Sequence, residues 1–394
     1  MPDLYNYAER LKRKIAEINN SKDISKHNKE KILEFQRSCL AHGLSNARIL
    51  RYLNDLPNVA KKLNKNFEKL NKSDIETIMA EIESTNLAHA TKTSYAVTLK
   101  KFYKWLNGGE EYPKCVKWLR TTEKNNNNKL PEELLTDEEV KKMIELALNP
   151  RDRALLAVLW ESGCRIGELL TMQIKHVSFE KEITRINIDG KTGMRRVPLI
   201  DSTPYLAEWV ENHPFKNNPK AFLWVSIGTV NRYEPLEYAA CRKMLRELAK
   251  KAGITKAINP HALRHGRATI NARHFTEAQM NQYFGWIQGS DISRVYVHMS
   301  GRDVDDAILK MKGIKKEEET VEKTLSPKKC TRCGVINKST GKFCINCGMA
   351  LDLKVAMELK DASDSIDEYF AKVLEDDEVK KLLQLKLKEM ANKK

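Results

Sequence analysis

Four consecutive asparagines set between lysines, at 125–128, are the feature that most constrains how this chain can fold. Nothing in this stretch can contribute to an apolar core, and its side chains favour solvent, so it is typical of a linker. We place the linker at 121–133. The 394-residue chain must therefore fold as separate units around it, and its length is sufficient for two or three domains.

The region before the linker, 1–120, is predicted to be helical. Apolar residues recur three or four positions apart in three stretches, 29–40, 46–53 and 91–106. Ser73 is the expected N-cap of a further helix over 74–83. Lysines cover the remaining faces of 91–106, either as an ordinary solvated surface or as a surface that faces DNA.

A second domain is predicted over 134–314, beginning with a capping box formed by Thr136 and Glu139. The alternating pattern of 183–188 and the glycine-containing turn that follows predict a β-hairpin. The expected elements, in order, are helices from 136 to 148, over 152–161 and from Arg165, the hairpin strands 183–188 and 196–200, and further helices to about 312. The predicted fold is mainly α with a small antiparallel β-sheet.

The formal net charge of +16 and a pI of about 9.3 favour a polyanionic partner, of which nucleic acid is the commonest. The longest uninterrupted apolar run, 154–160, is far shorter than the ~20 residues that a membrane span needs. Residues 1–20 lack the apolar segment of a signal peptide. We therefore expect an intracellular, cytoplasmic protein without a membrane segment.

Four short segments carry side chains that suit chemistry on an anion. Arg165 begins a helix, and Glu168 shares its face. Lys191 stands at the tip of the hairpin. A helix start after Pro260 presents two histidines and an arginine, an arrangement suited to phosphate. The side chains of this third segment are His261, Arg264 and His265, and the fourth segment contributes Trp286 and Tyr296. Each segment alone also fits a bland role, as a surface ion pair, a solvated lysine, a polar helix start or a core tyrosine.

Taken together, the order Arg, Lys, His-x-x-Arg, Trp, Tyr resembles the tyrosine recombinase (integrase) family. The resemblance covers 60–314 well and extends to 20–314. It is carried most specifically by Gly-Cys-Arg-Ile-Gly-Glu-Leu at 163–169 and His-Ala-Leu-Arg-His-Gly at 261–266. Residues 101–106 resemble the end of a helix in the family's core-binding domain, and 299–304 resemble archaeal members. Trp286 stands where many members have histidine.

The resemblance implies that Tyr296 attacks a DNA phosphodiester and becomes a 3′-phosphotyrosine. Arg165 and Arg264 offer planar guanidinium groups that match the non-bridging oxygens. By resemblance, Lys191 protonates the leaving 5′-oxygen. Because the ester conserves the energy of the phosphodiester, we expect neither ATP nor a catalytic metal. The remaining expected roles are phosphate contact or tyrosine deprotonation for His261 and an indole N–H donor for Trp286. Glu168 is expected to orient Arg165 without touching the DNA, and His265 to support the site in a similar way.

A separate signal comes from the pattern Cys-x2-Cys-x10-Cys-x2-Cys near the C-terminus. Four thiolates at this spacing suit tetrahedral Zn²⁺, and because four ligands close the site we expect it to be structural. The expected ligands are Cys330, Cys333, Cys344 and Cys347. We predict a zinc ribbon over 328–352 and a helical tail over 353–394.

The function predicted from these features is site-specific DNA recombination, for integration or excision of a mobile element or for resolution of replicon multimers. The resemblance implies that four protomers act on two double-stranded DNA sites, and the free protein can still be a monomer. Two alternatives stay open. One is a type IB topoisomerase, which shares the tyrosine chemistry, and the other is a catalytically silent DNA-binding protein of the same fold.

Overall fold

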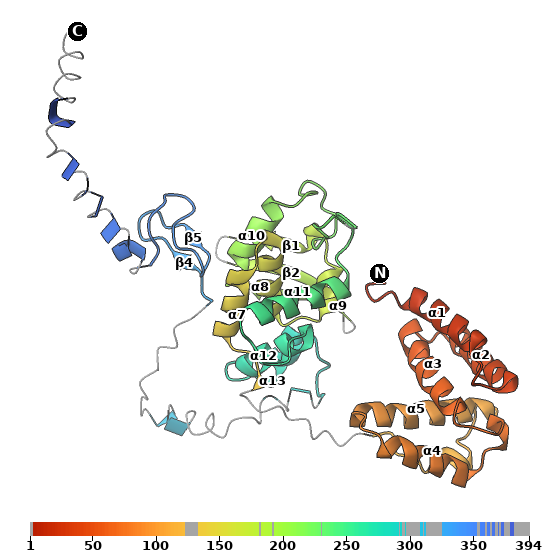
Figure 1. Cartoon of the computed structure of the whole chain (residues 1–394). Coiled ribbons are helices and arrows are strands. Elements are labelled where there is room, and N and C mark those ends of the chain that lie inside the picture. Colours follow the sequence, from red (N-terminus) through yellow and green to blue (C-terminus); the bar gives the residue numbers. More distant parts are fainter. Residues whose placement is uncertain are drawn as a thin grey trace. The chain divides into compact units, whose positions relative to one another are not determined.

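The computed structural model describes residues 3–122, 133–180, 183–190, 193–229, 231–290 and 325–352, together with short stretches between 292 and 312 and between 355 and 381. The chain forms two compact units, unit 1 (1–129) and unit 2 (130–394). Figure 1 shows that helices dominate both units and that the strands lie in unit 2. The predicted fold class, mainly α with small antiparallel sheets, is confirmed.

Unit 1 is a helical bundle with its own apolar core. The third helix lies at its centre and packs against the first, second and fifth helices. The elements are α1 (Tyr7–Asn20), α2 (Lys26–Ala41), α3 (Asn46–Ala60), η1 (Phe67–Lys69), α4 (Lys72–Ser84), α5 (His89–Leu106) and α6 (Lys114–Lys117). The prediction that Ser73 caps the fourth helix is wrong. Asn71 is the N-cap, because its side chain accepts from the Asp74 backbone N–H and the Asp74 carboxylate accepts in return from the Asn71 N–H.

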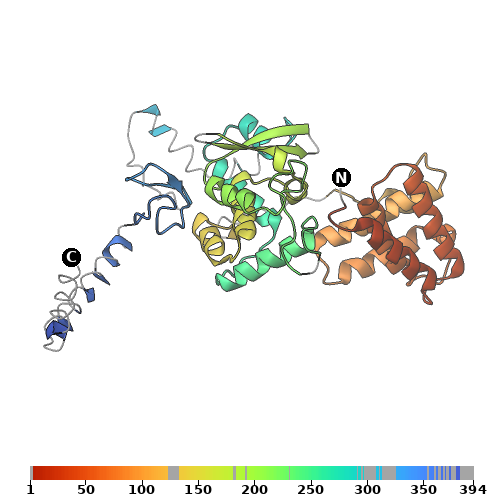
Figure 2. The ribbon, with the colours of Figure 1, turned by 90° about the horizontal axis from the view of Figure 1, so that it is seen from above.

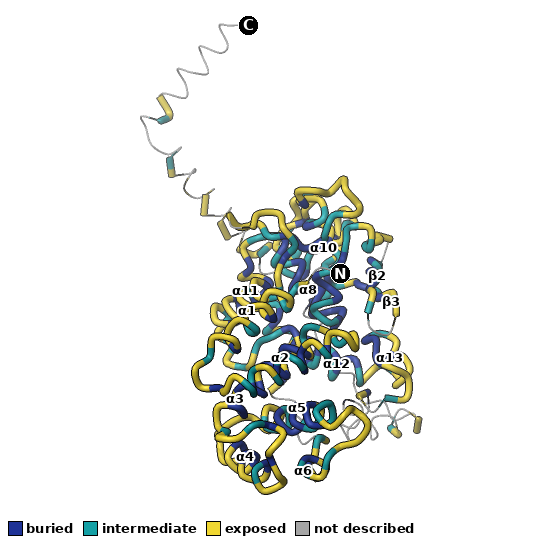
Figure 3. The backbone as a smooth tube through the Cα atoms, turned by 90° about the vertical axis from the view of Figure 1, so that its right-hand side faces the viewer, coloured by how far each residue is buried: buried dark blue, intermediate teal, exposed yellow. Residues whose placement is uncertain are grey.

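Unit 2 is built around α8, an apolar helix that is buried along almost its whole length. It packs against α7, α10, α12 and strand β3. Figure 3 shows the buried positions of α8 in dark blue. The helical elements are α7 (Asp137–Leu146), α8 (Pro150–Ser162), α9 (Ile166–Leu170), η3 (Ile174–His176), α10 (Thr203–Glu211), α11 (Tyr238–Lys251), α12 (Pro260–Asn271) and α13 (Glu277–Phe284).

A three-stranded antiparallel sheet with the order β1-β2-β3 lies on one side of unit 2, as Figure 2 shows. Its strands are β1 (Val177–Phe179), β2 (Thr184–Gly190) and β3 (Gly193–Leu199). The predicted hairpin is confirmed: Ile186 pairs with Val197, and Gly190 pairs with Gly193 at the turn. The short strand β1 was not predicted, because three residues are too few to show an alternating pattern.

Towards the C-terminus, β4 (Lys328–Lys329) pairs with β5 (Ile336–Asn337) in a small hairpin beside the cysteines. The described stretches between 355 and 381 are helical. Every helix among the described residues is too short or too polar to cross a membrane.

Candidate active site and cysteine cluster

Arg165 lies at a sharp junction between two helices. α8 ends at Gly163, whose φ of +53° turns the chain, and a Cβ at this position would lie 2.5 Å from Cε1 of Phe284. Glycine is therefore favoured by both conformation and space. Arg165 then occupies the N-cap of α9. Its side chain is 37% exposed, so the guanidinium group remains accessible to a ligand.

Glu168 holds two arginines at once. One carboxylate oxygen accepts from Nη1 of Arg165 at 3.0 Å, and the other accepts from the Arg165 backbone N–H at 3.1 Å and from Nη2 of Arg195 at 2.6 Å. Burial raises the pKa of Glu168, but its hydrogen bonds and charge interactions with the two arginines outweigh burial and bring the pKa below its usual value. Glu168 is thus a carboxylate that fixes the orientation of Arg165.

Arg195 is the residue of this site that the sequence analysis missed. Its side chain is 7% exposed, and its Nε donates to the Tyr283 carbonyl at 3.1 Å. The sequence did contain a signal for Arg195, because it lies on the same face of β3 as the buried residues Val197 and Leu199. An arginine on the buried face of a strand requires an acidic partner, and Glu168 supplies it.

Arg264 is buried between the end of α8 and the end of α13. Its Nη1 donates to the Gly163 carbonyl and its Nη2 donates to the Phe284 carbonyl, both at 2.7 Å. The guanidinium carbon lies over the rings of Phe284 and Trp286, 5.3 and 5.4 Å from their centroids. Burial and, next, the charge of Arg165 lower the pKa of Arg264 to about 10. The group therefore remains a cation at neutral pH.

The two predicted phosphate-binding arginines converge on one segment of chain. Arg165 donates from Nη1 to the Gly285 carbonyl at 3.2 Å, directly after the Phe284 carbonyl that Arg264 contacts. The charge of each disfavours the other, and an anion bound between them would relieve this repulsion. Two guanidinium groups beside each other form a site suited to an oxyanion such as a phosphodiester.

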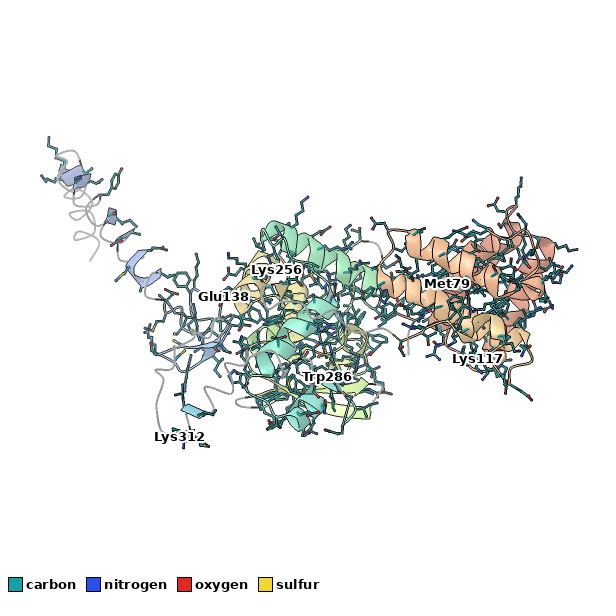
Figure 4. The ribbon with its side chains drawn as sticks, turned by 90° about the horizontal axis from the view of Figure 1, so that it is seen from below. Met79, Lys117, Glu138, Lys256, Trp286 and Lys312 are labelled. Carbon is teal, nitrogen blue, oxygen red and sulfur yellow. The ribbon has the colours of Figure 1, made fainter. Side chains whose placement is uncertain are left out.

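Tyr296 is buried next to this pair, with 8% of its surface exposed. Its ring stacks on Trp286 with centroids 5.4 Å apart and planes 6° apart, and Trp286 stacks in turn on Phe284. Trp286 is labelled in Figure 4, among the side chains of unit 2. Burial raises the pKa of Tyr296 to about 12, and the charge of Arg264 opposes this rise.

The two histidines lie one helical turn apart on α12. Their rings make an edge-to-face contact with centroids 4.2 Å apart. His261 is exposed, whereas His265 is half-buried and its Nδ1 is hydrogen-bonded to the Tyr296 hydroxyl. The sequence analysis gave His261 either contact with the phosphate or deprotonation of the tyrosine, and the described hydrogen bond to the Tyr296 hydroxyl comes from His265. Lys191 lies outside the described residues.

The four predicted zinc ligands come together at the C-terminal hairpin. Their sulfur atoms all lie within 4.8 Å of one another, with Sγ–Sγ distances of 3.6 Å for Cys330–Cys347 and 3.5 Å for Cys333–Cys344. A tetrahedral zinc site with Zn–S bonds of about 2.3 Å requires sulfurs about 3.8 Å apart, which is close to these values. The donor set and its spacing therefore fit Zn²⁺.

Each half of this cluster is a tight turn. The N–H of Gly334 donates to the Cys330 carbonyl, and the N–H of Gly348 donates to the Cys344 carbonyl, both at 2.9 Å. The Asn337 side chain crosses between the halves, because its Oδ1 accepts from the Ile345 N–H at 2.9 Å. These bonds hold the two cysteine pairs face to face.

The cysteine cluster packs against α10 of the same unit. The Tyr205 hydroxyl lies 3.0 Å from both the Ser339 and the Thr340 hydroxyls. The Lys338 ammonium forms an ion pair with Glu208 at 2.6 Å. Tyr205 is 1% exposed, so the segment that carries the cysteine cluster covers a position that belongs to the core of unit 2.

Comparison with known proteins places this geometry in a family. The model of the phage integrase family matches residues 133–302. The tyrosine recombinase XerA of Pyrococcus horikoshii is 30% identical over 199 residues, which are 48% of this chain and 66% of that protein. A tyrosine recombinase of Thermosipho africanus is 23% identical over 295 residues, covering 72% of this chain and all of that protein.

Solved structures share the fold. The XerH site-specific recombinase in a post-cleavage complex with a palindromic difH substrate has a TM-score of 0.56 at 21% identity, covering 78% of this chain and 96% of that one. A lambda integrase dimer bound to a COC′ core site has a TM-score of 0.55 at 15% identity, covering 71% of this chain and 79% of that one. These solved structures show the fold, and the family model together with the curated relatives shows that the chain belongs to the phage integrase family of tyrosine recombinases.

Proposed function

We propose that this enzyme is a site-specific DNA recombinase in which the Tyr296 hydroxyl attacks a DNA phosphodiester. The observation that carries the proposal is the convergence of Arg165 and Arg264 on the 284–285 segment, with Tyr296 stacked on the neighbouring Trp286. A phenol beside two fixed cations is arranged for attack on a phosphate whose oxygens those cations hold.

In the proposed reaction the Tyr296 oxygen forms a bond to phosphorus and the bond from phosphorus to the 5′-oxygen breaks. Arg165 and Arg264 neutralise the charge that grows on the non-bridging oxygens. The leaving 5′-oxygen takes a proton, for which Lys191 is our candidate donor. Rejoining is the same step reversed by a 5′-hydroxyl from the other duplex. The phosphoester is conserved throughout, so the cycle needs no external energy source.

Double-stranded DNA is the substrate that the chemistry and the charge favour. The chain has a net charge of +16, and α5 of unit 1 carries lysines on its polar side. Such charges bind phosphates without reading sequence. The titles of the solved neighbours fit a site-specific substrate, because XerH was solved bound to a difH substrate and lambda integrase bound to a COC′ core site.

The test of Tyr296 is a suicide substrate with a nick near the cleavage site, which traps the phosphotyrosyl adduct on a denaturing gel. We expect an adduct with the natural protein and none with Tyr296→Phe, while both bind the DNA equally. Tyr283→Phe is the matched control, because the Tyr283 hydroxyl is buried and donates to the Glu161 carbonyl at 2.8 Å. An adduct in Tyr296→Phe would refute the assignment.

Recombination itself is tested by strand exchange between two oligonucleotide duplexes. A recombinase exchanges strands, whereas a topoisomerase of the same chemistry relaxes supercoiled DNA without pairing two sites.

We propose that four protomers act on two sites, with 304–312 reaching a neighbouring protomer. Ile308 and Met311 in this segment are 48% and 74% exposed. Deleting 304–312 should leave DNA binding intact and abolish synapsis, and recombination by the deletion variant would contradict this role.

For the cysteine cluster we propose a structural Zn²⁺ held by Cys330, Cys333, Cys344 and Cys347. About 25 residues with two-residue strands cannot build a stable core unaided, and zinc binding, worth roughly 10–16 kcal/mol in comparable peptides, would supply the missing folding free energy. We expect the ribbon to assist contact with DNA or a partner. Chelation should weaken binding to full sites and leave cleavage of the suicide substrate. Loss of the cleavage step on chelation would place the metal's role in the active site instead.

A further inference from the structure

His265 is the residue whose position the proposed reaction has not yet used. It follows Arg264 on α12, and its Nδ1 is hydrogen-bonded to the Tyr296 hydroxyl. The centroids of the two rings lie 5.6 Å apart, with an angle of 36° between the ring planes. This is a contact with the atom that would attack phosphorus.

The buried phenol needs a proton acceptor. With its pKa raised to about 12 by burial, Tyr296 is ionised at pH 7 to only about one part in 10⁵. An acceptor within hydrogen-bond distance removes the requirement for a free phenolate, because the proton leaves as the oxygen–phosphorus bond forms. Such an acceptor contributes typically 10²- to 10⁴-fold in rate.

One nearby carboxylate already has other partners. The Glu168 carboxylate is occupied by Arg165 and Arg195. Within the part of the chain that the structure describes, the charged or titratable groups around the Tyr296–His265 pair are His261 and Arg264 on α12, with Arg165 and Glu168 next to Arg264. Arg264 is a cation, and the exposed His261 contacts the His265 ring edge to face.

We infer that His265 is the general base that accepts the Tyr296 proton during strand cleavage, an inference that rests on the proposed function. The Tyr296 O–H proton moves to Nδ1 of His265 as the phenol oxygen bonds to phosphorus and the 5′-oxygen leaves. His265 becomes an imidazolium, and in the rejoining step it returns the proton to the Tyr296 oxygen. His261, exposed one turn earlier, remains our candidate for contact with the phosphate.

The decisive variant is His265→Asn. The asparagine Oδ1 occupies nearly the place of the imidazole Nδ1, so it can accept the hydrogen bond but cannot take the proton. We expect the rate of adduct formation in single-turnover cleavage to fall by 10²- to 10³-fold, with DNA affinity and melting temperature close to those of the natural protein. His274→Asn is the matched control, since His274 is an exposed histidine just after α12.

Two further measurements separate a base from a merely structural residue. With a 5′-bridging phosphorothiolate, whose leaving sulfur needs no proton, the natural protein's rate should rise with pH through the range in which histidine titrates, near ~6.5. This rise of the cleavage rate with pH should be absent in His265→Asn. Added imidazole should restore cleavage to His265→Ala and not to His261→Ala.

The outcomes distinguish the inference from the proposed function. If Tyr296→Phe still forms an adduct, the proposed function itself fails. If Tyr296→Phe forms none, but His265→Asn cleaves within twofold of the natural rate, only the role of His265 fails. Two other results would also overturn the role of His265: a flat pH profile of the natural protein on the phosphorothiolate substrate, or rescue of His261→Ala alone by imidazole. Neither result depends on how the asparagine variant folds.

Discussion

Glu168→Gln is the substitution that tests the arginine network most directly. It keeps the shape of the side chain and removes the charge that Arg165 and Arg195 share. The glutamine amide can accept from one arginine but presents an N–H₂ group to the other, so one guanidinium loses its partner in a buried place. We expect both the stability of unit 2 and the rate of DNA cleavage to fall.

The magnitude follows from burial. Removing one partner of a buried ion pair costs about 3 to 5 kcal/mol. Arg195 is 7% exposed and bears this cost fully, whereas Arg165 is 37% exposed and can be hydrated. We therefore expect a loss of about 3 kcal/mol in the free energy of unfolding. Cleavage should fall about 10²-fold, because Arg165 loses the carboxylate that orients it.

The assay is urea unfolding of the DNA-free protein, followed by tryptophan fluorescence, with Glu180→Gln as the matched control. Glu180 pairs with Arg185 at 2.9 Å, but both side chains are exposed, so loss of this ion pair should cost less than about 1 kcal/mol.

The pKa of Glu168 is lowered in the folded state, so the stabilisation by its carboxylate is present above the unfolded-state pKa, near ~4.3, and is lost as pH falls through the folded-state pKa. The difference between the two proteins should be constant from pH 6 to 8 and shrink below about pH 4.

The reasoning would be refuted by a cost for Glu168→Gln no larger than that for Glu180→Gln. It would also be refuted by a difference that grows as the pH falls, because this would mean that the folded state does not favour the ionised carboxylate.

Two other predictions concern packing around the site. Gly285→Ala should destabilise unit 2 by about 1 to 3 kcal/mol more than Gly253→Ala. Both glycines have positive φ, but a Cβ at 285 would lie 2.7 Å from Nη1 of the fixed Arg195, whereas a Cβ at 253 meets no atom within 4 Å. Equal effects of the two substitutions in thermal unfolding would rule out the clash. Tyr205→Phe should cost about 1 kcal/mol by removing the hydroxyl that contacts Ser339 and Thr340. This difference from the natural protein should disappear once a chelator has unfolded the ribbon, and its persistence would show that Tyr205 acts within α10 alone.

Local features were predictable from the sequence because they depend on neighbours in the chain. The Thr136 side chain accepts from the Glu139 N–H as its spacing predicted, and the hairpin closes where two patterned strands flank a glycine turn. The cysteine cluster forms for the same reason, since two residues separate the cysteines of each pair and each pair forms a tight turn. The predicted cap at Ser73 failed because the helix begins earlier, at Lys72, where Asn71 caps it through the Asp74 N–H.

The order of ionisable residues identified the family and its candidate site, because chemistry selects residue types that stand out from their surroundings. The order could not show which side chain meets which. The spacing placed two histidines on one face of α12, and only the packing of that helix against residue 296 set His265, rather than His261, against the tyrosine hydroxyl.

The remaining features of the site were decided by tertiary structure alone. Arg165 and the carbonyl of Gly285 are 120 residues apart in sequence, and Tyr205 and Ser339 are 134 apart. Periodicity indicates which face of an element is buried, but it carries no information on which other element covers that face. Glu168 could thus be paired with Arg165 from their spacing, whereas its shorter contact, to Arg195, exists only because β3 packs beside α9 and the end of α13.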